Sequence, residues 1–153
     1  MSSSKLRVRI RLHLAIQEVL EREADWEGIR LGTLTNRILQ NEFDEIQRVG
    51  IENCRFADSE PDVDAEKYYI IPSSEERKQY MPTNSRGQES GAQVSLFMSE
   101  QQYKYLCTLT KQEMRQGTWK RDKDGNITVT SVRYIIVGLL LNSPQLKELT
   151  FRD

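Results

Sequence analysis

Three arginines alternate with apolar residues near the start of the chain, at Arg7, Arg9 and Arg11. No acidic residue precedes Glu18, so positive charge is concentrated at this one place. Each guanidinium group can donate two parallel hydrogen bonds to O6 and N7 of a guanine. Because successive side chains of a β-strand point to opposite faces, the three arginines would share one face. The pattern predicts either a cationic surface that forms hydrogen bonds with guanine bases, or an edge strand whose charges only prevent aggregation.

A second alternating segment, at positions 93–98, offers a different set of side chains. Its inward face is apolar, with Val94, Leu96 and Met98. Its outward face carries Gln93, Ser95 and Phe97. A glutamine amide can pair with adenine, a serine hydroxyl accepts several bases, and a phenyl ring can contact the methyl group of thymine. A shift of register by one residue would expose three apolar residues, so we expect Phe97 to face outward.

The elements that must position the first strand follow it directly. One helical pattern extends from His13 to Gly28, and another begins at Thr33 or Thr35, both good N-cap residues, and ends at Gly50. Residues 1–50 therefore predict a strand followed by two helices. Chains below about 55 to 65 residues rarely form an independent core, so we expect this unit to pair with a second copy.

A divergent second copy is found at residues 92–153. After its strand, Ser99 caps a helix that extends to Gly117, and a last helix begins at Thr130 or Ser131 and ends before Pro144. Residues 117–129 predict a hairpin insert between these helices, because Asp-Gly lies between two β-prone arms. Aligning the last helix of each copy places a hydroxyl residue two positions before an arginine in both, at 35–37 and at 131–133.

Residues 51–91 separate the two copies. They hold five basic and nine acidic side chains and three of the four prolines, which is typical of an exposed acidic linker. Residues 68–71, Tyr-Tyr-Ile-Ile, interrupt it. This short apolar stretch either docks on the core or offers a surface to a protein partner.

A basic alternating strand followed by two helices resembles the ribbon-helix-helix family of DNA-binding proteins, the Arc and MetJ superfamily. The resemblance covers residues 5–48 and 92–142, and two units on one chain are similar to the TraY-type relaxosome proteins of conjugative plasmids. It implies a mainly α fold with a short antiparallel two-stranded ribbon, in which one chain forms a pseudo-dimer. The ribbon would lie in the major groove of double-stranded DNA, which is roughly 12 Å wide. The six outward residues would then read bases, and two different strands would prefer an asymmetric site.

In that family the second helix of each unit points its N-terminus at a DNA phosphate, where backbone amides and the helix dipole favour an anion. The resemblance therefore implies phosphate contacts at Lys5, Thr33, Thr35, Arg37, Thr130, Ser131 and Arg133. For the hydroxyl residues the alternative is ordinary N-capping. For Arg37 and Arg133 the alternative is a solvated surface position.

The resemblance implies a sequence-specific DNA-binding protein that is not an enzyme, and it leaves the cellular role open. The first role is a transcriptional repressor or regulator, and the second is a relaxosome accessory protein at a plasmid transfer origin. Self-association on neighbouring DNA sites is compatible with both. A protein-binding adaptor without DNA binding is a third role, which the acidic middle segment and the net charge of -1 would suit.

Other functional classes find little support. His13 is the only histidine, so a serine or cysteine nucleophile would have a single candidate base. Cys54 and Cys107 lack metal-ligand spacing, which indicates reduced thiols, and we expect neither a metal nor a cofactor. The longest apolar run, at 134–141, is far shorter than the roughly 20 residues that cross a bilayer. The basic start lacks the apolar stretch of a secretory leader, so we expect a cytoplasmic protein.

Overall fold

A computed structural model describes residues 5–57, 66–82, 90–114 and 129–150. In chain order the elements are β1 (Leu6–His13), α1 (Leu14–Glu27), α2 (Leu31–Val49), η1 (Ile51–Asn53), β2 (Cys54–Phe56), β3 (Tyr69–Ile71), α3 (Ser74–Gln79), β4 (Ser90–Met98), α4 (Glu100–Met114), α5 (Val129–Leu141) and α6 (Lys147–Thr150). The fold is mainly helical, with two small two-stranded sheets. Within the described ranges, no helix has the length and apolar character needed to cross a bilayer.

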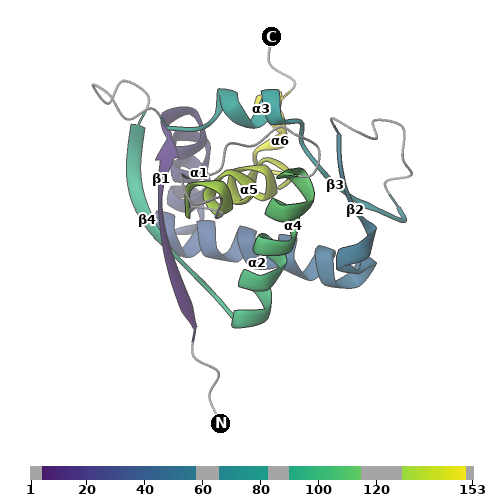
Figure 1. Ribbon diagram of the computed structural model, residues 1–153. Coiled ribbons are helices and arrows are strands. Elements are labelled where there is room, and N and C mark those ends of the chain that lie inside the picture. Colours follow the sequence, from purple (N-terminus) through teal and green to yellow (C-terminus); the bar gives the residue numbers. More distant parts are fainter. Residues whose placement is uncertain (1–4, 58–65, 83–89, 115–128, 151–153) are drawn as a thin grey trace.

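Strands β1 and β4 form an antiparallel ribbon, as the alternating segments predict. Their register pairs Val8 with Leu96 and Ile10 with Val94, and all four side chains are buried. Burial of one face fixes the register, because a slip by one residue would move the apolar set to the solvent side. The helices pack on this apolar face, and the ribbon lies at one side of the molecule (Figure 1).

Helix α1 begins and ends where the sequence predicts. The Nδ1 atom of His13 accepts a hydrogen bond from the backbone N–H of Ala15 at 3.0 Å, so His13 is the N-cap. Gly28 ends the helix in the left-handed conformation, with φ of 72°. The lone histidine therefore serves the junction between β1 and α1, and its ring packs edge-on against Tyr80.

Helix α2 begins earlier than predicted. It starts at Leu31 rather than at Thr33 or Thr35, and Arg30 is its N-cap residue without a side-chain hydrogen bond. The hydroxyl of Thr35 donates instead to the carbonyl of Leu31 at 2.8 Å from inside the helix, and Thr35 is buried. Packing of Leu31 and Leu34 against the core outweighs the capping preference of the threonines.

Two helices, α4 and α5, follow β4, as the sequence predicts. Ser99 caps α4 as predicted, because its hydroxyl accepts from the Gln102 N–H at 3.1 Å while the Gln102 side chain accepts from the Ser99 N–H at 2.9 Å. Helix α5 lies in the centre of the molecule, in contact with α2, α3, α4 and β3 (Figure 1). These neighbours surround it, which explains why nearly every residue from 132 to 141 is buried.

The described part of residues 51–91 is not an exposed linker, contrary to the prediction from its composition. Cys54, Phe56, Ile71 and Arg77 are completely buried. Strands β2 and β3 pair in parallel, so the apolar stretch at 68–71 docks on the core. The average composition concealed this because a few apolar residues at alternate positions are enough to anchor the segment. The acidic residues at 58–64, Gly117 and the predicted hairpin up to residue 128 lie outside the described residues.

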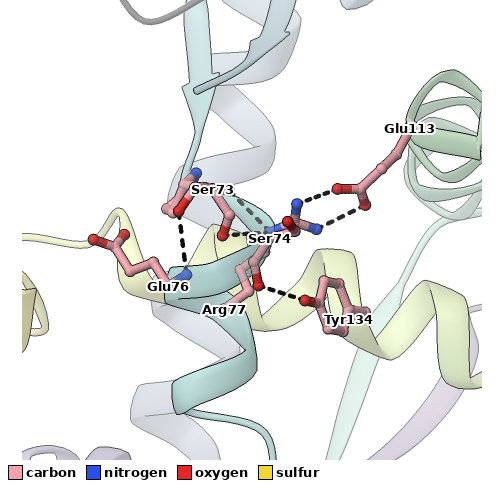
Figure 2. A network of polar contacts seen from close by, with 7 residues as sticks. Ser73, Ser74, Glu76, Arg77, Glu113 and Tyr134 are labelled. Carbon is pink, nitrogen blue, oxygen red and sulfur yellow. Dashed lines mark hydrogen bonds and ion pairs between the residues drawn. The ribbon is translucent and has the colours of Figure 1, made fainter. Parts of the chain in front are cut away.

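A buried ion pair fastens α3 to α4. The guanidinium group of Arg77 forms two hydrogen bonds with the carboxylate of Glu113, and neither side chain is more than 1% exposed. Figure 2 shows the fork of Arg77 directed at Glu113 from α3. The Nε atom of Arg77 donates to the Pro72 carbonyl at 2.9 Å, and its guanidinium lies 4.6 Å from the centre of the Tyr134 ring. The donors of this buried cation are thereby matched with acceptors.

Gly138 of α5 allows the middle segment to approach closely. A β-carbon at this position would lie 2.9 Å from Cδ of Arg77 and 3.0 Å from Cγ2 of Ile71. Overpacking typically costs about 1–3 kcal/mol, while alanine improves helix propensity by about 1 kcal/mol. We therefore expect Gly138→Ala to lower the free energy of unfolding by about 1 kcal/mol in urea titrations. The control is Gly32→Ala in α2, where the β-carbon meets open space and stability should not fall; equal effects of both substitutions would contradict this account.

Candidate nucleic-acid interface

The outward face of the β1–β4 ribbon carries the six residues for which the sequence predicts base reading. They form three cross-strand pairs, Arg7 with Phe97, Arg9 with Ser95, and Arg11 with Gln93. All are exposed except Ser95, which is half-buried. Two residues that are far apart in the sequence therefore stand side by side at each level of the ribbon.

The three arginines differ in whether their side chains form hydrogen bonds or ion pairs with described residues. Within the described part of the chain, the side chains of Arg7 and Arg9 have no hydrogen-bond or ion-pair partner. Arg11 donates through Nη1 to the carbonyl of Gly91 at 3.1 Å, which ties it to the start of β4. Free guanidinium groups keep their full donor set for a ligand, so Arg7 and Arg9 are the stronger candidates for bidentate contacts.

Side chains from α2 and α5 form hydrogen bonds with backbone groups at the two edges of the ribbon. The amide of Asn36, from α2, donates to the Ser95 carbonyl at 2.9 Å and accepts from the Phe97 N–H at 2.8 Å. At the opposite edge Arg133, from α5, donates through Nε to the Arg9 carbonyl at 2.8 Å. Thus α2 contacts β4, and α5 contacts β1. These contacts occupy the Ser95 carbonyl, the Phe97 N–H and the Arg9 carbonyl, which are then not available to a foreign strand.

Two basic pockets flank the ribbon. The larger, about 800 Å³, lies between β4 and the N-terminus of α2, and its charged lining residues are Lys5, Arg30 and Arg37. The other, about 670 Å³, lies beside β1 and is lined by Arg7, Arg9 and Arg133. Neither has an acidic residue among its described lining residues. Both edges of the ribbon therefore offer a cationic hollow to an anionic ligand.

The N-terminus of α2 opens into the larger pocket. Its first intrahelical hydrogen bond runs from the Leu34 N–H to the Arg30 carbonyl, so the preceding amides point out of the helix. Gly32 and the exposed Thr33 line the pocket. Thr35 does not, because its hydroxyl is buried and bonded within the helix, so the prediction of a phosphate contact at Thr35 is wrong for this structure.

The other predicted phosphate residues have different surroundings. Arg37 forms an ion pair with Glu27 at 2.6 Å, and this contact raises the pKa of Arg37. Lys5 is exposed next to the ribbon. Thr130 and Ser131 lie in the first turn of α5, but their side chains are outside the described part of the structure. Of the predicted set, Lys5, Thr33, Arg37 and Arg133 line the two pockets.

Sequence reasoning missed Asn36, Gln40 and Arg30. Asn36 and Gln40 support the ribbon from α2, since the Gln40 amide donates to the Phe97 carbonyl at 3.2 Å. In the alignment of the two copies Asn36 stands opposite Val132, so the repeat gave no signal for it. Arg30 immediately precedes α2, and an earlier predicted start of the helix would have drawn attention to it.

The two cysteines and the potential metal ligands were the candidates for thiol or metal chemistry. Cys54 and Cys107 are free thiols, and burial raises the pKa of Cys54 to about 12, which keeps it protonated. The described residues contain no group of three or more potential metal ligands.

A buried acid lies at the other end of α2, where the hydroxyl of Tyr69 donates to Oε1 of Glu42 at 2.6 Å. Desolvation raises the pKa of Glu42 above its ordinary value of 4.5, although the bond from Tyr69 acts in the opposite direction. The folded state therefore binds this proton more tightly than the unfolded state does. Stability contributed at acid pH is lost as the pH rises from about 4.5 through the folded-state pKa.

We expect Glu42→Gln to raise the melting temperature at neutral pH, because glutamine keeps an oxygen acceptor for Tyr69 and cannot ionise. The gain should shrink as the pH falls through the folded-state pKa and should vanish below about 4.5, where Glu42 is protonated in both the folded and the unfolded state. Glu18→Gln is the control, because Glu18 is an exposed carboxylate on another helix, α1. A wild-type protein more stable than the Glu42→Gln variant at neutral pH would show that the charged form is the one stabilised.

Comparison of the chain with models of protein families, with curated protein sequences and with solved structures found no match. What the chain does must therefore be inferred from the ribbon and the pockets beside it.

Proposed function

We propose that the protein binds double-stranded DNA by placing the outward face of the β1–β4 ribbon in the major groove. The observation that carries the proposal is the arrangement of that face, where three exposed arginines of β1 stand opposite Gln93, Ser95 and Phe97 of β4. A two-stranded ribbon fits the roughly 12 Å groove and offers base edges only its outward side chains. Here that side is polar and cationic while the inward side is apolar and buried.

A pseudo-dimeric ribbon-helix-helix fold is part of this proposal. Its support is a pair of reciprocal hydrogen bonds to the ribbon. Asn36 in the first proposed unit donates to the Ser95 carbonyl in the second unit, and Arg133 in the second unit donates to the Arg9 carbonyl in the first. The two carbonyls belong to residues that pair directly with each other. Such exchange of contacts between two strand–helix–helix units is the pattern expected of two halves related by an approximate two-fold axis.

The flanking pockets would receive the DNA backbone. On the β4 side, Lys5, Arg30 and the amides at the start of α2 face one pocket, where the helix dipole also favours a phosphate. On the β1 side, Arg133 uses Nε for Arg9 and keeps its terminal nitrogens for a second phosphate. Arg37 would contribute once a phosphate competes with Glu27 for its guanidinium group.

The two strands differ, so the preferred DNA site should be asymmetric. Arginines favour guanine, whereas glutamine favours adenine, and each good pair contributes roughly 1–3 kcal/mol of discrimination. A protein that reads such a site would act in the cytoplasm as a regulator of transcription, which is the role we propose. Recognition of a plasmid transfer origin would use the same face, and the identity of the preferred site would separate the two roles.

The test is selection of bound fragments from random duplex DNA, followed by titration of affinity against salt. A DNA-binding protein should enrich one asymmetric sequence, and the logarithm of its affinity should fall linearly with the logarithm of salt concentration. A protein-binding adaptor would enrich no sequence and show no salt-dependent binding to random duplex. Enrichment of a perfect palindrome would also contradict the proposal, because the chain presents two different strands.

A further inference from the structure

Phe97 is an apolar ring on an otherwise polar reading face. It is 43% exposed, and the other large exposed apolar residues of the described structure, Leu14 and Trp26, belong to α1 rather than to the ribbon. Both backbone groups of Phe97 are engaged by α2, since its N–H donates to Asn36 and its carbonyl accepts from Gln40. The side chain is thus held on the outward face by contacts that do not depend on the ring.

Arg7 stands directly opposite this ring. The backbone groups of Phe97 point away from β1, toward α2, so Arg7 and Phe97 form a non-hydrogen-bonded pair. The α-carbons of such pairs lie about 4.5 Å apart, which is the closer of the two antiparallel spacings. Stacked nucleotides follow one another at about 3.4 Å along the helix axis. The two side chains can therefore reach neighbouring base pairs at the same time.

Arg7 and Phe97 offer complementary chemistry to those base pairs. A free guanidinium recognises O6 and N7 of guanine, and an exposed phenyl ring gains by contact with an apolar group. The apolar group that an unmodified base pair presents in the major groove is the C5-methyl of thymine. Cytosine methylated at C5 carries the same group at the same place. A base step with a methyl group beside a guanine matches this pair of side chains.

Resting on the proposed function, we propose that the Arg7–Phe97 pair makes DNA binding depend on a C5-methyl group next to a guanine. The methyl group is supplied by thymine, or by 5-methylcytosine where the site has a cytosine–guanine step. Cytosine methylation at that step then strengthens binding, so the ribbon distinguishes modified from unmodified DNA. The other two cross-strand pairs have no apolar side chain on this face and carry no such dependence.

The experiment begins with the duplex enriched from random DNA and replaces each thymine in turn with deoxyuridine, which removes only the methyl group. At one position the affinity of the wild-type protein should fall about fourfold, the factor that corresponds to burial of one CH₂-sized group. Placing cytosine there and then methylating it should recover a similar factor relative to unmethylated cytosine. Phe97→Ala should be indifferent to both changes, whereas Trp26→Ala, which removes an exposed ring away from the ribbon, should respond as the wild type does.

The contribution of Arg7 is tested on the neighbouring guanine. Replacing that guanine with 7-deazaguanine, which lacks the N7 acceptor, should weaken the wild-type protein and leave Arg7→Ala unaffected. A selected duplex that tolerates deoxyuridine at every position would overturn the methyl inference and leave DNA binding in place. Persistence of the methyl effect in Phe97→Ala would also overturn it. Failure to enrich any duplex would instead remove the proposed function on which the inference rests.

Discussion

Replacing Arg9 with alanine is expected to reduce affinity for the selected duplex by roughly 5- to 150-fold, the equivalent of 1–3 kcal/mol. Arg9 occupies the middle of the ribbon, opposite Ser95, and its exposed side chain has no partner among the described residues. The bond from Arg133 reaches its backbone carbonyl, which alanine keeps. The melting temperature should therefore stay within a degree or two, and preference for one base pair of the site should relax.

The control for this result is Arg48→Ala. Arg48 is an exposed arginine at the far end of α2, paired with Glu45, so its removal changes the net charge equally without touching the ribbon. Equilibrium binding of both variants to selected and to random duplex separates base reading from general attraction. A similar loss for Arg9→Ala on both kinds of DNA would assign Arg9 to a phosphate, and equal affinities of the two variants would contradict reading by the ribbon.

Replacing Arg77 with methionine is expected to lower the free energy of unfolding by about 3–5 kcal/mol. The substitution removes the buried cation that forms an ion pair with the carboxylate of Glu113, and it removes a donor from the Pro72 carbonyl. It also removes the cation that lies against the Phe56 ring and against the Tyr134 ring, the second of which is labelled in Figure 2. Because Arg77 joins α3 to α4, the loss should appear in the cooperative unfolding transition measured by urea titration.

A double variant distinguishes the loss of charge balance from the loss of packing at this site. In Arg77→Met with Glu113→Leu neither charge of this pair remains, so much of the stability lost in the single variant should return. Arg48→Ala provides the exposed reference, where loss of the pair with Glu45 should cost no more than about 1 kcal/mol. A double variant no more stable than Arg77→Met would show that shape and hydrogen bonds at this site matter more than charge balance.

The ribbon could be predicted from the sequence because the alternation of residues is a local property. Strict alternation in both segments determines which side chains face the core, and pairing of the two apolar faces then places Arg9 opposite Ser95. The predicted capping of α4 by Ser99 is local as well. In these elements a few neighbouring residues carry the signal.

The parts that could not be predicted depend on contacts between distant residues. Arg77 and Glu113 are 36 positions apart, and nothing near either one indicates that it is buried. The hydrogen bond from Asn36 to the Ser95 carbonyl of β4 also joins residues that are far apart in the sequence. Composition also averages over residues 51–91, so the few apolar positions that anchor β2 and β3 were outweighed by the acidic ones. Packing of Leu31, rather than a capping threonine, sets the start of α2.

Both strands of the ribbon belong to one polypeptide, and this has a consequence for the response to gene dosage. A DNA-binding surface that is built from two identical chains forms only when the chains associate. The active fraction of such a protein therefore falls when its concentration is low. Here the surface is complete in every folded molecule, because β1 and β4 meet within the same chain. Under the proposed function, occupancy of a single DNA site should then rise with the first power of protein concentration.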